Sequence, residues 1–330
     1  MDAPPFIISS DAINLIAEIS SMLERYIIAM EGDAGLKLRK ANRIKTIHSS
    51  LAIEGNTLSE DEVADIINGK KIVAPIRQVA EVKNAIKVYD AYRSLNPFSE
   101  KDLLRAHGIM MEALTDDAGR YRKGGVGVYG EKGLIHMAPP AKMVPQLIGN
   151  LMEWLNESKD HLLIRSCVFH YEFEFIHPFS DGNGRMGRLW QSLILGRLNP
   201  VFEYVPVENM VFANQENYYN AIYESTKSGQ SGPFIDFMLR EIRNTIIKYK
   251  RIEKVPDKVL DKVPNKTQMM IVRLLMESPR MTSTQLAEKI GISSRGVVKA
   301  IQSLKRQGIL ERVGSNKSGM WKVNSDNNHG

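Results

Sequence analysis

Apolar residues recur every three or four positions along most of the chain, which is the spacing of amphipathic α-helices. Between residues 11 and 30 the pattern is carried by Ile13, Ile16, Ile19, Met22, Leu23 and Ile27. The same spacing predicts further helices at 77–94, 141–157, 162–176, 184–198, 214–228 and 232–250. Ser59 and Ser99 are expected to cap two more helices, because an acidic residue, Glu62 or Asp102, follows each at the third position. The pattern therefore predicts an all-α protein.

The helical pattern is interrupted once within this region. Residues 120–137, RYRKGGVGVYGEKGLIHM, are rich in glycine and β-branched residues, which predicts a loop or a small β-hairpin. Residues 251–265 repeat Lys, Asp and Pro with little periodicity and are interpreted as an interdomain linker or a frayed helix end.

Composition places the chain among ordinary globular proteins. It has 330 residues, of which 43% are hydrophobic and 25% are charged. No apolar run reaches the roughly 18 residues that a membrane span needs, and the first residues lack the basic and apolar regions of a secretion signal. Cys167 is the only cysteine, so an intramolecular disulfide is excluded and a cytoplasmic location is expected.

The positive charge is concentrated in the C-terminal part of the chain. Residues 251–330 contain 15 Lys and Arg against 7 Asp and Glu, a net charge of +8 in a chain whose total is +6. This asymmetry is compatible with nucleic-acid binding, and also with a solvated charged surface.

Residues 177–188, HPFSDGNGRMGR, gather polar and glycine chemistry between two apolar helices. Pro178 disfavours the α conformation at His177 and so ends the first helix. Gly182 and Gly184 allow positive φ angles around Asn183, which would expose consecutive N–H groups at the start of the next helix. Arg185 and Arg188, which lie on one face of its first turn, would add positive charge. The stretch is therefore predicted to bind a chain of phosphates.

The same stretch carries a candidate metal ligand and a candidate base. The carboxylate of Asp181 would repel phosphates unless Mg²⁺ bridged them, and His177 could take a proton from an attacking hydroxyl. The stretch is not a Walker loop, because no Gly-Lys-Ser/Thr follows the glycines. Taken singly, each part has a plainer reading: a turn, a helix cap or a solvated helix face. Their combination in twelve residues favours displacement at a nucleotide phosphate.

HPFSDGNGRMGR resembles the signature of the Fic family, His-x-Phe-x-Asp/Glu-Gly-Asn-Gly-Arg-x-x-Arg, at every fixed position. GRYRKGGVGV at 119–128, NYYNAIYE at 217–224 and GPFIDFML at 232–239 are similar to further segments of that family. The resemblance covers roughly residues 1–250. It implies a Fic-type helical core with a small β-hairpin flap, and transfer of AMP from ATP to a protein hydroxyl with release of pyrophosphate.

The resemblance also implies roles for individual residues. His177 would be the catalytic base, and Asp181 would hold Mg²⁺. Gly182, Asn183 and Gly184 would bind the α-phosphate, while Arg185 and Arg188 would contact the β- and γ-phosphates. Phe179 would be a buried anchor. Tyr218 and Tyr219 would line the nucleoside pocket, and Val126 would lie in a flap that docks the target protein. Thr226 falls near a position where the family often has Asn, which leaves the adenine contacts open.

Residues 50–55, SLAIEG, fit a helix end in which Gly55 follows the last turn. Within a Fic-like chain, Ser50, Glu54 and Gly55 also resemble the family's inhibitory motif [ST]-x-x-x-E-[GN]. A carboxylate at Glu54 would then pair with Arg188 in the place of the γ-phosphate. The resemblance thus implies an autoinhibited enzyme.

Residues 282–323 resemble a winged helix-turn-helix domain. Val297, Val298, Ile301 and Leu304 predict the apolar side of its second helix, and residues 310–323 alternate around a turn as a β-wing does. Arg295, Lys299 and Gln302 recur on the polar side, where a helix that reads a DNA groove needs them. DNA contact and packing against protein both remain open.

The expected organisation is an N-terminal helical region at 1–96, a catalytic core at 97–250, the linker at 251–265 and the winged helix domain at 266–326. ATP, Mg²⁺ and a protein substrate are the expected ligands, with DNA and a second copy of the chain as further candidates. Removal of AMP from a modified protein, and DNA-binding regulation with a nucleotide sensor, remain alternatives to AMP transfer. The target protein and the modified residue are not readable from the sequence.

Overall fold

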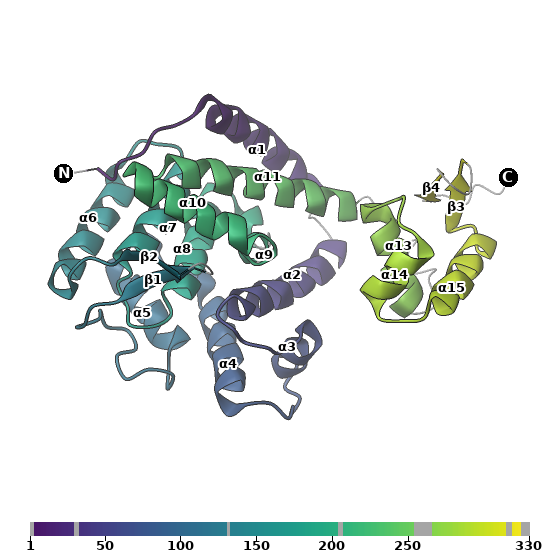
Figure 1. The fold of residues 1–330 in the computed structure, drawn as a ribbon, viewed down its shortest axis with the longest axis horizontal. Coiled ribbons are helices and arrows are strands. Elements are labelled where there is room, and N and C mark those ends of the chain that lie inside the picture. Colours follow the sequence, from purple (N-terminus) through teal and green to yellow (C-terminus); the bar gives the residue numbers. More distant parts are fainter. Residues whose placement is uncertain are drawn as a thin grey trace. The chain divides into compact units, whose positions relative to one another are not determined.

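The computed structural model describes residues 3–29, 33–130, 133–203, 207–253, 266–314 and 319–324. The chain forms two compact units, Met1–Thr245 and Ile246–Gly330 (Figure 1). The first unit contains α1 (Ser10–Ala29), α2 (Asp33–Ala52), α3 (Glu60–Ile67), α4 (Ile76–Asp90), α5 (Glu100–Met110), α6 (Val144–Glu157), α7 (Leu162–Ile176), α8 (Asn183–Leu198), α9 (Val207–Ala213), α10 (Gln215–Ser228) and most of α11 (Gly232–Glu253). This architecture confirms the all-α prediction.

The core of the first unit is built around α7 and α8. Apolar residues lie on all sides of α7, as expected for a helix surrounded by others, although a few polar side chains such as His170 and Glu174 are buried with them. Most of its side chains are buried, and α8 packs along it with Met186, Leu189 and Trp190 fully buried. The connection between these two helices, residues 177–182, therefore lies against the core of the unit.

Capping side chains begin two of the helices as the sequence predicts. At α3, Ser59 Oγ accepts from the Glu62 N–H and the Glu62 carboxylate accepts from the Ser59 N–H, which completes a capping box. At α5, Ser99 Oγ accepts from the Asp102 N–H at 3.2 Å. The Asp102 carboxylate instead accepts from the Asn96 N–H, so this second cap is not reciprocal.

Some element boundaries differ from the prediction. α2 and α9 were not expected, apart from the helix end near Gly55, because α2 is rich in polar residues and α9, with 7 residues, is too short to show a helical period. α4 ends at Asp90 and is followed by a 3₁₀ turn, Tyr92–Ser94. Two more such turns, Ala141–Met143 and Pro200–Glu203, precede α6 and follow α8. Tertiary packing thus decides boundaries that periodicity leaves open.

The glycine-rich segment after α5 forms the predicted hairpin. Strands β1 (Gly127–Gly130) and β2 (Gly133–Met137) pair antiparallel, and the register shifts between Val128 and Tyr129. Val126 lies just before β1, and its carbonyl accepts from the Ala138 N–H at 3.1 Å.

The second unit has the predicted winged helix form. It contains α13 (Lys266–Glu277), α14 (Ser283–Ile290), α15 (Ser294–Arg306), β3 (Leu310–Val313) and β4 (Met320–Val323). β3 and β4 pair antiparallel as the wing. Gly291, at a φ of 73°, makes the tight turn between the two helices. Most of the expected linker at 251–265 lies outside the described residues.

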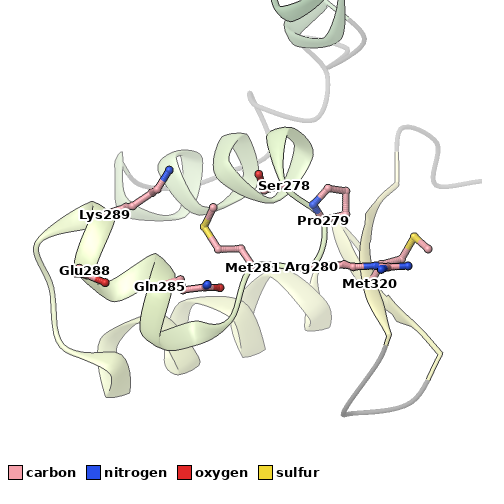
Figure 2. A pocket seen from close by; sticks show the side chains of 8 residues that line it. All are labelled: Ser278, Pro279, Arg280, Met281, Gln285, Glu288, Lys289 and Met320. Atoms are coloured by element: carbon pink, nitrogen blue, oxygen red, sulfur yellow. The ribbon is translucent and has the colours of Figure 1, made fainter. Parts of the chain in front are cut away.

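An open pocket of about 880 Å³ lies on the second unit. Its lining comes from the loop after α13, from α14 and from Met320 of β4 (Figure 2). None of the predicted catalytic residues contributes to it. Among the described helices, none combines the length and the apolar character that crossing a bilayer requires.

Candidate active site

His177 stands at the C-terminal end of α7 in the left-handed region, with φ 50° and ψ 62°. This conformation agrees with the predicted effect of Pro178, which excludes a further helical residue. Arg122 holds the helix end in place. Its guanidinium donates to the backbone carbonyls of Ile176 and His177, and its backbone N–H donates to the Pro178 carbonyl. The buried Arg122 thereby satisfies carbonyls that a helix end leaves without partners.

The imidazole of His177 has a defined proton position. Its Nδ1 lies 3.2 Å from the backbone carbonyl oxygen of Glu174, an atom that can only accept. Nδ1 must therefore carry the proton, and Nε2 carries the basic lone pair. Pro178 has no N–H with which to compete for that carbonyl.

Asn183 holds the connecting loop by its side chain. Its Oδ1 accepts from the Phe179 N–H and its Nδ2 donates to the Phe179 carbonyl, both at 2.8 Å. The Phe179 ring is fully buried, as expected for an anchor, and stacks on His107 with a centroid distance of 3.6 Å. Gly182, at a φ of +85°, makes the turn into α8.

Gly184 has a different role from Gly182. The expectation of positive φ is wrong at Gly184, which lies inside the first turn of α8. Its missing side chain matters for space, because a Cβ atom there would lie 2.6 Å from Glu54 Oε1. The carboxylate of Glu54 therefore rests directly against the glycine loop.

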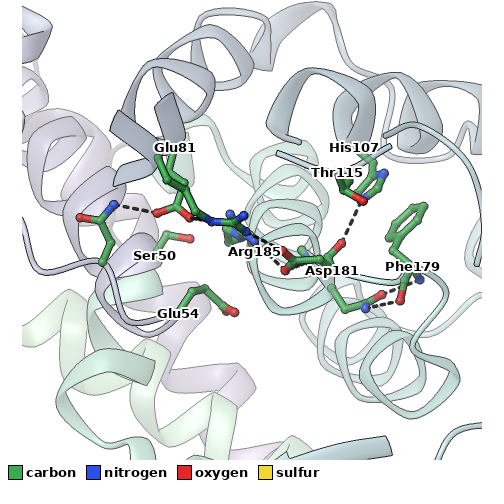
Figure 3. A network of polar contacts seen from close by, with 12 residues as sticks. Ser50, Glu54, Glu81, His107, Thr115, Phe179, Asp181 and Arg185 are labelled. Atoms are coloured by element: carbon green, nitrogen blue, oxygen red, sulfur yellow. Dashed lines mark hydrogen bonds and ion pairs between the residues drawn. The ribbon is translucent and has the colours of Figure 1, made fainter. Parts of the chain in front are cut away.

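Arg185 is buried beside Asp181, which it contacts at 2.8 Å from Nη2 to Oδ1 (Figure 3). Its Nε and Nη1 are buried and have no hydrogen-bond partner among the described residues. A buried N–H group without an acceptor destabilises a folded protein. The two unpartnered donors of Arg185 therefore indicate a site for an anionic ligand.

Arg188 is likewise buried and pairs with Glu54 at 2.7 Å from Nη2 to Oε1. The same Nη2 donates to the Ser50 carbonyl, and Nε lies 3.4 Å from Ser50 Oγ. The structure therefore brings the C-terminal end of α2 onto the first turn of α8, as the Ser50–Gly55 motif predicts. Both arginines are buried, so neither belongs to a solvated helix face.

Asp181 is partly exposed and accepts from three donors. Its Oδ1 accepts hydrogen bonds from the backbone N–H of Gly182 and from the Arg185 guanidinium. Its Oδ2 lies 3.3 Å from Arg77 Nη2. Arg77 stands in the first turn of α4 and also approaches Glu81 at 3.5 Å. This contact of Arg77 was not foreseen from the sequence, since α4 lies about 100 residues earlier in the chain.

His107 is a second residue that the sequence did not indicate. Its Nδ1 accepts from the Gly119 N–H at 2.9 Å, so its Nε2 is the protonated atom and donates to the Asp181 carbonyl at 3.0 Å. Burial lowers the pKa of His107, which favours this neutral form. Nothing in the local sequence signals this role; only the Fic-like Gly-x-Tyr-Arg segment nearby marks the region.

A polar network lies behind Arg188. Glu208 is buried and accepts from Tyr89 Oη at 2.8 Å and from Ser192 Oγ at 3.3 Å. Burial raises the pKa of Glu208. The neighbouring Asn209 contacts Ser49, so α9 supports the end of α2 that carries Glu54.

The paired tyrosines of α10 face different surroundings. Tyr218 is buried, and its hydroxyl lies 3.0 Å from His170 Nε2, while His170 Nδ1 contacts Gln191 at 2.6 Å. Burial lowers the pKa of His170 to about 4, so the ring is neutral at ordinary pH. Tyr219 is half-buried and meets the Tyr218 ring edge-on.

Thr226 lies near these rings. Its hydroxyl donates to the Ile222 carbonyl at 2.9 Å and lies 3.3 Å from Tyr171 Oη.

Metal ligands are sparse in this site. Within the described ranges, no cluster of three His, Cys, Asp or Glu side chains could hold a metal ion. A lone carboxylate at Asp181, next to unpartnered donors of Arg185, still fits Mg²⁺, which is commonly bound by one or two carboxylates together with nucleotide phosphates and water.

The polar side of α15 is a candidate nucleic-acid interface. Its apolar residues Val297, Ile301 and Leu304 are buried. The three predicted contact residues, Arg295, Lys299 and Gln302, are all exposed. Val298 was assigned to the apolar side, yet it is 42% exposed.

Family comparisons agree with both units. The Fic/DOC family model matches residues 97–195, and a winged helix-turn-helix DNA-binding model matches residues 264–311. The chain is similar to a crystal structure of a Fic family protein from Desulfovibrio desulfuricans G20, with 36% identity and a TM-score of 0.72. The match covers 98% of this chain and 99% of that one.

Relatives named as protein adenylyltransferases also match. A probable protein adenylyltransferase of Aquifex aeolicus is 26% identical over 83% of this chain and 82% of its own length. Protein adenylyltransferase fic-1 of Caenorhabditis elegans is 28% identical over 62% of this chain, and the match spans 40% of its own length. The chain thus covers less than half of the nematode relative.

Proposed function

Because the chain belongs to the Fic/DOC family, we propose that it transfers AMP from ATP to a hydroxyl side chain of a protein and releases pyrophosphate. The observation that carries the proposal is the pair of buried, unpartnered donors of Arg185 beside the base His177 and the glycine turn. The names of the relatives support the same activity.

The triphosphate would lie along the first turn of α8. Backbone N–H groups at a helix N-terminus and the helix dipole favour anions. Around Gly182–Gly184 these groups would receive the α-phosphate and stabilise the charge that grows in the transition state. Nε and Nη1 of Arg185 would then find phosphate oxygens as acceptors. Arg188 would receive the γ-phosphate once Glu54 had moved away.

The chemical step requires one proton transfer. The target oxygen attacks the α-phosphorus and forms a new P–O bond, while the bond between the α-phosphorus and the bridging oxygen to the β-phosphate breaks. Pyrophosphate leaves with that electron pair. The hydroxyl proton passes to Nε2 of His177, whose Nδ1 is held protonated by the Glu174 carbonyl.

Asp181 is the residue that would hold Mg²⁺, together with phosphate oxygens of the nucleotide. When bound, the ion would neutralise charge on the phosphates. In the structure Arg77 and Arg185 share this carboxylate. We infer that Arg77 gives up its contact when the ion binds.

Glu54 would act as an internal brake. Its carboxylate pairs with Arg188 at 2.7 Å and lies against Gly184, which is the space that the γ-phosphate would need. ATP that binds beside it would present its α-phosphate in the wrong direction for attack. An extended target segment would pair with the edge of β1, which begins directly after Val126.

The proposal is tested by incubating the Glu54→Gly variant with magnesium, ATP and candidate acceptor proteins. The expected result is a protein that gains AMP in step with pyrophosphate release, and no gain when His177→Ala is added. Loss of AMP from a protein that already carries it, without any gain, would instead identify a hydrolase that uses the same site.

DNA binding by the second unit is a separate proposal. Exposed Arg295, Lys299 and Gln302 on α15, and the match to a DNA-binding family model, support it. A helix of this kind enters the major groove and reads base edges, while Lys and Arg contact phosphates.

A further inference from the structure

Glu174 stands one helical turn before His177 on α7 and presents two different atoms to the same imidazole nitrogen. Its backbone carbonyl oxygen lies 3.2 Å from His177 Nδ1, and its side-chain Oε2 lies 3.8 Å from the same Nδ1. The first contact fixes the proton position. The second places an ionisable carboxyl next to the protonated nitrogen of the base.

The carboxyl of Glu174 is held in a tight and buried place. Only 5% of the residue is exposed, and Oε1 has no hydrogen-bond partner among the described residues. A Cβ atom at Gly187 would lie 2.6 Å from Oε1, so α8 passes too close for any side chain there. The Fic-like signature allows any residue at position 187. We therefore attribute the glycine at this position to the space that the Glu174 carboxyl occupies.

The titratable and charged groups that surround the carboxyl come from several elements. They are His170 and His177 of α7 and its end, Arg188 of α8, Tyr218 of α10 and Glu54 after α2. Burial raises the pKa of Glu174 to about 8, the positive Arg188 lowers it, and Glu54 raises it. Burial is therefore the main reason why the carboxyl holds its proton at pH 7, and Glu54 adds to this effect.

We propose that Glu174 is the positioning residue of His177, and that its ionised carboxylate strengthens the base. The inference rests on the proposed function, since His177 acts as a base only in that reaction. When Nε2 takes the proton of the target hydroxyl, the ring becomes an imidazolium with Nδ1–H directed at Glu174. A carboxylate at 3.8 Å stabilises this cation, whereas a neutral carboxyl does not.

The proposal also links the brake to the base. Glu54 raises the pKa of Glu174, while Arg188, the ion-pair partner of Glu54, lowers it. Removal of the Glu54 carboxylate is expected to let Glu174 ionise at lower pH. Glu54 would then restrain the enzyme twice, once by filling the phosphate site and once by keeping the partner of His177 neutral.

Nuclear magnetic resonance of ¹³C-labelled histidine tests the coupling without any need for activity. The His177 signal is identified by its absence in His177→Ala. In the wild-type chain this signal is expected to shift a second time near pH 8, when Glu174 ionises, and Glu174→Gln is expected to abolish that second step. Glu172→Gln is the matched control: it removes another carboxyl of α7 whose pKa burial raises, to about 7, and it should leave the step in place.

The kinetic test uses the Glu54→Gly background. There Glu174→Gln should lower kcat roughly tenfold at pH 8, since an opposite charge at this distance shifts a base by about one pKa unit or more. KM for ATP should change little, and Glu174→Asp should recover part of the rate.

Two outcomes would overturn the inference: a wild-type His177 signal without a second step, or an identical kcat in the Glu174→Gln variant across pH 6–9. If Glu54→Gly transfers no AMP at all, the proposed function fails, while the resonance titration still decides whether Glu174 and His177 are coupled.

Discussion

Glu54 and Arg188, separated by 134 positions in the chain, form an ion pair of 2.7 Å at the mouth of the glycine loop. The guanidinium is buried and the carboxylate is partly exposed. The pKa of Arg188 lies above its usual value: burial alone would lower it, and Glu54, together with Tyr218 and Glu174, more than offsets that effect. The cation is thus fully charged and already has an anion, so a phosphate must displace a carboxylate in order to bind.

Glu54→Gly is expected to raise the rate of AMP transfer by about tenfold or more, because it removes a charge-assisted pair that competes with the γ-phosphate. The rate is measured as incorporation of the nucleotide label at fixed ATP concentration. Glu60→Gly, which removes an exposed carboxylate nearby on α3, should leave the rate within about twofold. Equal rates for wild type and Glu54→Gly would show that the ion pair is no brake.

Arg77→Ala is expected to lower the magnesium concentration that gives half-maximal nucleotide binding. Arg77 contacts Asp181 Oδ2 at 3.3 Å and is 60% exposed, so the contact is worth little, about 0.2–1 kcal/mol. The shift should then be about 1.4- to fivefold, read by calorimetric titration of ATP at several magnesium concentrations. Lys83→Ala on the same helix is the control. An unchanged or higher magnesium requirement would contradict the competition.

Thermal stability should fall as the pH rises from about 6.5 to about 8, within the interval in which folded Glu174 keeps a proton that the unfolded chain has lost. The pKa of Glu174 is raised from 4.5 to about 8 in the folded chain, so the folded state holds a proton that the unfolded state has lost. The stability from this group is present below about pH 4.5 and is lost as the pH passes 8. Each kcal/mol lost should lower Tm by roughly 2–4 °C.

Tm is measured by calorimetry at both pH values. Glu174→Gln cannot lose this proton, so its Tm should decline less over the same interval. Glu172 contributes in the same direction with a pKa of about 7, so part of the decline should remain. A Glu174→Gln variant that loses stability as steeply as the wild type would contradict the assignment.

Arg295→Ala and Lys299→Ala should each weaken DNA binding, and each lost phosphate contact should reduce the salt dependence of log K by about 1. Fluorescence anisotropy of duplex DNA at several salt concentrations measures both quantities. Lys159→Ala, which removes an exposed charge from the other unit, is the control. An affinity that does not change with salt would exclude binding driven by phosphates.

The predicted site residues that the structure brings together lie in short, dense stretches of the sequence. His177, the glycine turn and the two arginines belong to one loop and one helical turn, so local rules of backbone and charge suffice to place them together. Glu54 became visible only through a resemblance, because its partner Arg188 is more than a hundred residues away.

His107, Arg122 and Arg77 were missed for a related reason. Each acts on residues 177–181 through a contact that the fold creates, and none stands in a pattern that local periodicity can detect. Glu174 was hidden differently. It lies in a mostly apolar helix, where a single carboxyl gives no functional pattern. Its buried position becomes clear only in the fold, where the α8 backbone at Gly187 packs directly against the carboxyl.

The most direct test of the central claim uses ATP labelled either at the α-phosphate or at the γ-phosphate, supplied to Glu54→Gly with an acceptor protein. The account predicts that protein becomes labelled from the α-position alone, and that His177→Ala abolishes this labelling. Labelling from the γ-position alone would make the chain a kinase. An absence of labelling from either position, with magnesium and ATP bound, would contradict the proposed AMP transfer.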